Sequence, residues 1–90
     1  MDEKEVTFSL SYEQLTTITE QYIKTCIQNA TGTSGREAEI EMDWARATLD
    51  YWYLLTQAGK APDTVVEADR LRMTEMIWRT ASEEEHACRQ

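Results

Sequence analysis

The segment from residue 34 to residue 58 carries two apolar stripes, and this feature restricts the possible folds more than any other. One stripe repeats at alternating steps of four and three residues, the spacing of a helix that packs along its length: Ala38, Met42, Ala45, Leu49 and Trp52. The opposite side is also apolar, with Ile40, Trp44, Ala47, Tyr51, Leu54 and Leu55. A helix with two apolar sides needs two neighbours. It is therefore either the middle element of its own domain or shared with a partner subunit.

Residues 51–55 are consecutive apolar residues, a pattern that a β-strand also shows. The helical spacing that leads into them favours a helix instead. Ser34 followed three residues later by Glu37 is a capping-box pattern, in which each side chain bonds a backbone amide at the helix start. The sequence therefore predicts a helix over 35–58.

A preceding helix is predicted over about 12–30. Ser11 and Gln14 form a second capping-box pattern, and Gly32 suits the end of the helix. The predicted apolar stripe consists of Leu15, Ile18, Tyr22, Cys26 and Ala30, with Ile23 and Ile27 at its edge.

A third helix is predicted over 64–82 or beyond, after a turn that contains Gly59 and Pro62. Thr64 and Glu67 offer a third capping-box pattern. Val66, Met73 and Ile77 share one face of this predicted helix, with Leu71 and Trp78 to one side.

Residues 5–10 are expected to be a short β-strand or an extended arm, because apolar and small polar residues alternate from Val6 to Leu10. Together with the three helices, this predicts an all-α fold: one small three-helix domain over residues 1–90, with a short extended segment at its N-terminus. A chain of this size buries a thin core, so self-association is expected to add to its stability.

The chain is acidic, with 17 acidic and nine basic residues and a net charge of −8. Such a charge disfavours membrane surfaces and direct binding of nucleic-acid backbones, to which lysine and arginine supply most of the affinity. The sequence contains no apolar run long enough to cross a membrane, and its first residues lack the pattern of a secretory signal. A cytoplasmic location is therefore expected.

Little in the sequence points to catalysis, a cofactor or a metal. His86 is the single histidine, and Glu83 precedes it by three residues, a spacing that suits two metal ligands on one helix. Carboxylate-bridged sites in helical bundles need two such motifs and further glutamates. Cys26 is expected to pack as a small apolar residue, and Cys88 to be exposed. The prediction is a protein that is not an enzyme and has no metal or cofactor site.

One local concentration of acids lies on the 35–58 helix: Glu37, Glu39, Glu41 and Asp43. The helix dipole favours acids in a first turn, which accounts for Glu37 and Glu39 better than for Glu41 and Asp43. An alternative interpretation is a surface that imitates nucleic-acid phosphates and so inhibits a DNA- or RNA-binding protein.

The order of a short strand, a helix, a glycine turn and a second helix over residues 6–58 loosely resembles the ribbon-helix-helix family of DNA-binding proteins. That resemblance implies that Thr7 and Ser9 face outward from a strand paired with its copy in a dimer. The acids Asp2, Glu3 and Glu5 stand where the family carries bases, and the first predicted helix is longer than the family's.

The function that these patterns favour is a small, non-catalytic binding or regulatory protein. It is expected to self-associate, most simply as a dimer, and to act by docking on another protein. The expected interface is the second apolar side of the 35–58 helix, formed by Trp44, Tyr51, Leu54 and Leu55. The phosphate-imitating inhibitor and the ribbon-helix-helix-like regulator stay as alternatives.

Overall fold

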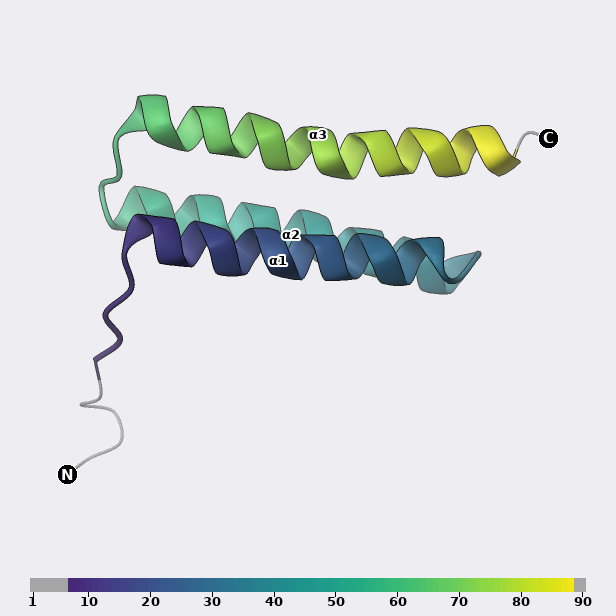
Figure 1. Ribbon diagram of the computed structural model, residues 1–90, viewed down its shortest axis with the longest axis horizontal. Helices are drawn as coiled ribbons and strands as arrows, with labels where there is room; N and C mark the ends of the chain where they lie inside the picture. The colour runs from purple at the N-terminus through teal and green to yellow at the C-terminus, as the bar shows by residue number, and fades with distance from the viewer. Residues whose placement is uncertain (1–6, 89–90) are drawn as a thin grey trace.

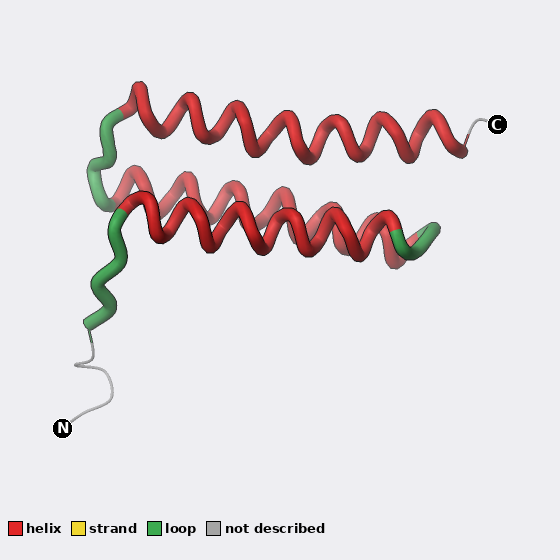
Figure 2. Tube along the Cα trace, in the orientation of Figure 1, coloured by secondary structure: helices red, strands yellow, loops and turns green. Residues whose placement is uncertain are grey.

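The computed structural model describes residues 7–88, and it describes side chains for residues 7–79. The described residues form three α-helices and no strand (Figures 1 and 2): α1 (Tyr12–Thr31), α2 (Arg36–Ala58) and α3 (Asp63–Cys88). The predicted all-α, three-helix fold is confirmed. α1 and α2 form an antiparallel hairpin, and α3 runs along one side of it (Figure 1).

The segment before α1 forms no strand over residues 7–10, and the side chains there are exposed. Residues 5 and 6, the rest of the predicted segment, lie outside the described residues. The described part of this segment is therefore an arm and not a β-strand, the other form that the sequence allowed.

α1 begins as its sequence predicts. Ser11 Oγ accepts a hydrogen bond from the backbone amide of Gln14 at 3.0 Å, and Gln14 Oε1 accepts one from the amide of Ser11 at 2.9 Å. This reciprocal pair satisfies two amides that have no partner inside the helix.

The predicted capping boxes of the other two helices are wrong. α2 is capped by Gly35, which has a φ of 65° and no side chain to bond an amide, so Ser34 lies one residue outside the cap. Glycine adopts this backbone conformation without the strain that a Cβ would cause. At α3, the Pro62 carbonyl accepts the bond from the amide of Val66 at 3.0 Å, so Thr64 lies inside the first turn.

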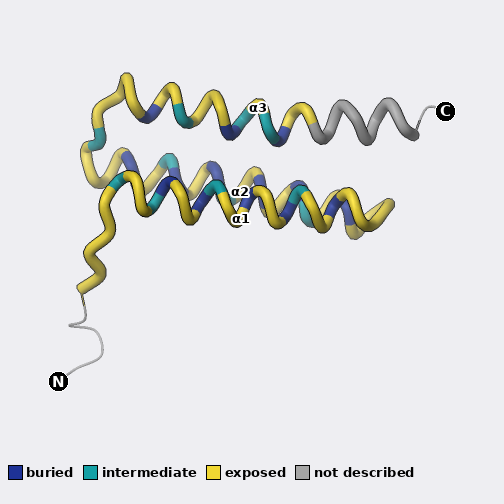
Figure 3. Tube along the Cα trace, in the orientation of Figure 1, coloured by how far each residue is buried: buried dark blue, intermediate teal, exposed yellow. Residues whose placement is uncertain are grey.

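The core is built on the regular stripe of α2. All five residues of the stripe predicted from the 4-3 spacing are buried, and Thr56 continues it by one further step. On α3, the residues predicted to share one face, Val66, Met73 and Ile77, are buried, whereas Leu71 and Trp78 beside them are exposed. Figure 3 shows these buried positions along the helices. The core of the domain therefore follows directly from the spacing in α2 and α3.

The predicted stripe of α1 is wrong in two of its positions. Ile18 and Tyr22 are 53% and 48% exposed, whereas Thr16 and Thr19 are buried. Burial of these hydroxyls is possible because both are hydrogen-bonded: Trp52 Nε1 donates to Thr16 Oγ1 at 3.0 Å, and Thr19 Oγ1 donates to the Leu15 carbonyl at 2.8 Å. The buried stripe of α1 is Thr16, Thr19, Ile23, Cys26 and Ala30.

Polar contacts add to the packing of α3 on the hairpin. The Tyr12 hydroxyl donates to Asp69 Oδ2 at 2.6 Å. Arg72 pairs with Asp69 at 3.1 Å and with Glu20 of α1. The guanidinium of Arg70 lies over the Tyr53 ring of α2, 4.4 Å from its centre, at a distance typical of a cation–π contact.

The Tyr12–Asp69 hydrogen bond predicts a specific dependence of stability on pH. Burial, and then the bond to Asp69, raises the pKa of Tyr12 to about 12. The same bond, helped by Arg72, lowers the pKa of Asp69. A raised tyrosine pKa stabilises the fold below pH ~10 and loses this effect as the pH rises toward 12. A lowered carboxyl pKa stabilises the fold above pH ~4 and loses this effect at lower pH.

We therefore expect Tyr12→Phe to lower the free energy of unfolding by about 1 kcal/mol between pH 5 and 9, since the bond is partly exposed. The difference from wild type should shrink below pH ~4 and again above pH ~10. Urea denaturation of both proteins across this range measures it, because all other titrating groups are common to the two. A difference that stays constant at every pH would contradict the assignment.

Candidate functional site

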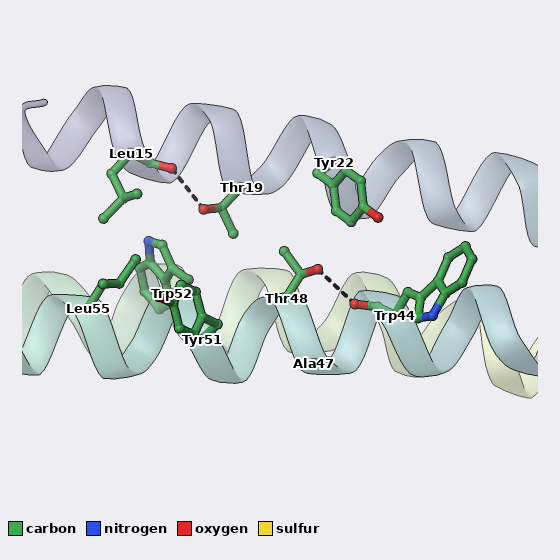
Figure 4. Close-up of a pocket in the computed structure, with 9 residues that line it drawn as sticks. All are labelled: Leu15, Thr19, Tyr22, Trp44, Ala47, Thr48, Tyr51, Trp52 and Leu55. Atoms are coloured by element: carbon green, nitrogen blue, oxygen red, sulfur yellow. Dashed lines mark hydrogen bonds between the residues drawn. The ribbon is translucent and has the colours of Figure 1, made fainter. Parts of the chain in front are cut away.

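The side of the α1–α2 hairpin that faces away from α3 carries a groove lined by side chains of both helices (Figure 4). From α2 it is lined by Trp44, Ala47, Thr48, Tyr51, Trp52 and Leu55. Apart from the buried Trp52, the large side chains among these are open to solvent: Trp44 is 51% exposed, Tyr51 63% and Leu55 37%.

α1 supplies the other wall with Leu15, Thr19 and Tyr22. In Figure 4 the Tyr22 ring points from α1 toward α2, and the side chains of Trp44 and Thr48 point from α2 toward α1 on either side of it. Thr48 Oγ1 donates to the Trp44 carbonyl at 2.7 Å, so the hydroxyl is used within its own helix and leaves its methyl group to the groove. The groove is thus mainly apolar.

Both helices repeat the same pattern along this side. In α1 the positions that precede each buried residue by one are Leu15, Ile18, Tyr22, Thr25 and Asn29. In α2 the corresponding positions are Glu37, Glu41, Trp44, Thr48, Tyr51 and Leu55. We call these two rows together the outer seam. Each row keeps the alternating three- and four-residue steps of a packing surface.

Charge is confined to one end of the outer seam. Glu37 and Glu41 lie near the loop that joins α1 to α2, and Asn29 Nδ2 contacts Glu41 Oε1 at 3.5 Å. The other outer-seam residues, from Leu15 to Asn29 on α1 and from Trp44 to Leu55 on α2, are uncharged. The seam therefore has an acidic end and a long neutral stretch.

The predicted acidic surface divides between two sides of α2. Glu37 and Glu41 lie on the outer-seam side, and Glu39 and Asp43 are turned away from it by about 200°, since each residue advances the helix by about 100°. Asp43 is paired with Arg46 at 3.0 Å. The four acids thus form two pairs rather than one continuous surface.

Three of the four predicted interface residues lie together. Trp44, Tyr51 and Leu55 line the groove, whereas Leu54 is 60% exposed but lies outside it. Sequence reasoning missed the α1 wall, because the predicted apolar stripe of α1 runs through Leu15 and Tyr22 instead of Thr16 and Thr19. The signal that could have found it is the 3-4-3-4 row Thr16, Thr19, Ile23, Cys26 and Ala30, which the two polar threonines obscure.

The described residues hold no chemically activated group on this face. Cys26 is buried below Tyr22, and burial, followed by the charge of Glu41, raises the pKa of the Cys26 thiol. A raised pKa keeps the thiol protonated and unreactive. At high pH, where the Cys26 thiol itself ionises, its negative charge is the main cause that raises the pKa of Tyr22. Residues 7–79 contain no cluster of three potential metal ligands. The Glu83–His86 pair and Cys88 lie outside the described side chains.

Comparison of the chain with profiles of protein families, with curated protein sequences and with solved structures found no match. Over residues 7–88, none of the helices is both long and apolar enough to span a bilayer.

Proposed function

We propose that this protein is a small, non-catalytic binding protein that acts by docking, and that the outer seam of the α1–α2 hairpin is its contact surface. The observation that carries the proposal is the groove between α1 and α2, which is lined mainly by partly exposed aromatic and aliphatic side chains and lies beside the buried core. Aromatic side chains such as Trp44 and Tyr51 are the residues that most often dominate the binding energy of protein interfaces.

The support comes from the rigidity of the scaffold as well as from the exposed area. Tyr22, Trp44, Tyr51 and Leu55 stand on two helices whose buried stripes are packed against each other. The backbone that carries these side chains is already ordered, so binding does not have to order it, which lowers the cost of association. Neither of the alternatives, imitation of phosphates or DNA binding by a ribbon, has a comparable feature among the described residues.

A photo-crosslinking amino acid at position 51 tests the proposal. We expect irradiation in cells of the native host to yield one defined adduct with a protein chain. The matched control is the same probe at position 71 on α3, since Leu71 is 61% exposed and Tyr51 63%. Position 71 should give no such adduct.

Competition makes the crosslinking test specific to the seam. Excess unlabelled wild-type protein should suppress the adduct from position 51, and excess Trp44→Ala should not. Absence of any adduct from position 51, or equal adducts from positions 51 and 71, would overturn the proposed function.

A further inference from the structure

The three helices are not packed equally. Over residues 63–79, the part of α3 whose side chains the structure describes, three side chains are buried: Val66, Met73 and Ile77. α1 buries five side chains and α2 buries six. α1 and α2 also pack against each other more extensively than either packs against α3. Apolar burial therefore holds the two helices of the hairpin together more strongly than it holds α3 to them.

A polar layer interrupts the inner row of α3. The first two of its buried residues are seven positions apart, and a continuous packing row would carry a further apolar residue between them. Asp69 and Arg70 occupy that level. Asp69 Oδ2 accepts the hydrogen bond from the Tyr12 hydroxyl of α1, and the Arg70 guanidinium lies over the Tyr53 ring of α2. The buried rows of α1 and α2 have no such gap. Polar positions in a packing row fix the register of a helix at a cost in stability.

Net charge also opposes the docking of α3. The hairpin, residues 12–58, contains seven acidic and three basic residues, and α3, residues 63–88, contains the same numbers. Two units with the same sign of net charge repel each other. Among residues 7–79, one ion pair joins α3 to the hairpin, that of Arg72 with Glu20 of α1. Both side chains are partly exposed, and ion pairs of this kind contribute little to stability.

We propose that α3 is a releasable element, which detaches from the hairpin and loses its helical hydrogen bonds while α1 and α2 stay packed on each other. Elements with few buried apolar contacts open at a lower free energy than the whole fold. A helix that leaves its packing surface also loses its main support, because helices in proteins depend on tertiary packing more than on propensity. Release uncovers the side of the hairpin that α3 covers (Figure 1).

Release leaves the outer seam in place, because both of its rows stand on α1 and α2. The groove lies on the side of the hairpin that faces away from α3. The closed state therefore has one apolar side of the hairpin open to solvent, and the released state has two. This conformational change is independent of the proposed function, since it needs no partner.

Hydrogen exchange of the full chain tests release directly. The amides to compare are those of buried residues: Val66, Met73 and Ile77 in α3, Ile23 in α1 and Leu49 in α2. Protection factors in α3 should be at least about tenfold lower than those in α1 and α2. Protection in α3 within that factor of the hairpin's would mean that the three helices open as one unit, and the proposal would be wrong.

Two matched glycine variants separate release from unfolding of the whole chain. Gln21 of α1 and Glu75 of α3 are exposed and lie inside their helices, so neither change creates a cavity. Glycine inside a helix should lower protection about two- to fivefold. Gln21→Gly should lower it in α1 and α2 and leave α3 unchanged, because α1 is helical both before and after release. Glu75→Gly should lower it in all three helices, because α3 is lost in both events. Equal losses in all three helices for Gln21→Gly would contradict release.

Thiol labelling gives a second readout within one chain. In a Cys88→Ser background, Met73→Cys places a thiol at a buried position of α3, and the native Cys26 is buried in the hairpin. A thiol reagent should label position 73 at least about tenfold faster than Cys26, since release exposes only the first. A smaller ratio overturns the proposal. None of these measurements involves a partner, so their outcome is separate from that of the crosslinking test.

Discussion

Trp52→Ala should destabilise this protein by about 3–5 kcal/mol, a large share of what a domain of this size has. Trp52 is 1% exposed and is the largest fully buried side chain among residues 7–79. It belongs to the regular stripe of α2 and meets Tyr12 of α1, with ring centres 6.3 Å apart. Its removal leaves a cavity at the point where α1 and α2 join, and Thr16 loses the indole N–H that satisfies its buried hydroxyl.

Urea denaturation followed by the helical signal measures this effect, with both proteins at the same concentration so that association contributes equally. Trp78→Ala is the matched control, because Trp78 is 64% exposed on α3. Its effect should stay within about 0.5 kcal/mol. A loss below about 1 kcal/mol for Trp52→Ala would mean that the α1–α2 junction is not the centre of the core.

Much of the fold could be predicted because the spacing in α2 is decisive. Ala38, Met42, Ala45, Leu49 and Trp52 repeat at packing intervals, and all are buried. The ends of the helices were also close to the prediction, since Gly32, Gly59 and Pro62 interrupt the helical pattern in turns where the structure also ends or begins a helix.

The α1 half of the candidate site could not be predicted from the sequence, because the polarity of Thr16 and Thr19 suggests exposed positions. Thr16 and Thr19 are polar as isolated residues, but each is buried with its hydroxyl hydrogen-bonded, to the Trp52 indole and to the Leu15 carbonyl. The Trp52 bond joins residues 36 positions apart, which a local pattern cannot reveal. With the threonines inside, Ile18 and Tyr22 move to the surface. The predicted cap of α2 is wrong for a similar reason, because the spacing of Ser34 and Glu37 does not reveal the positive φ of Gly35.

Alanine substitutions at the three tryptophans of this chain should separate effects on the free energy of unfolding from effects on association. Trp44 is 51% exposed on the outer seam, Trp52 is buried in the core, and Trp78 is exposed on α3. Trp44→Ala removes a large aromatic surface from the centre of the proposed interface but leaves the core stripe of α2 untouched. The free energy of unfolding of the monomer should therefore change by no more than about 0.5 kcal/mol.

Association should respond in the opposite way. Truncation of a central interface tryptophan commonly costs 2 kcal/mol or more, so Trp44→Ala should raise the dissociation constant by about 30-fold or more. Trp78→Ala should leave the dissociation constant within about threefold of wild type. Sedimentation across a range of concentrations gives these constants, and urea denaturation at concentrations where the chain is monomeric gives the stability. If Trp44→Ala unfolded the monomer, the outer seam would be part of the chain's own core. If the dissociation constant were unchanged, Trp44 would lie outside the interface, and association would have to use another surface.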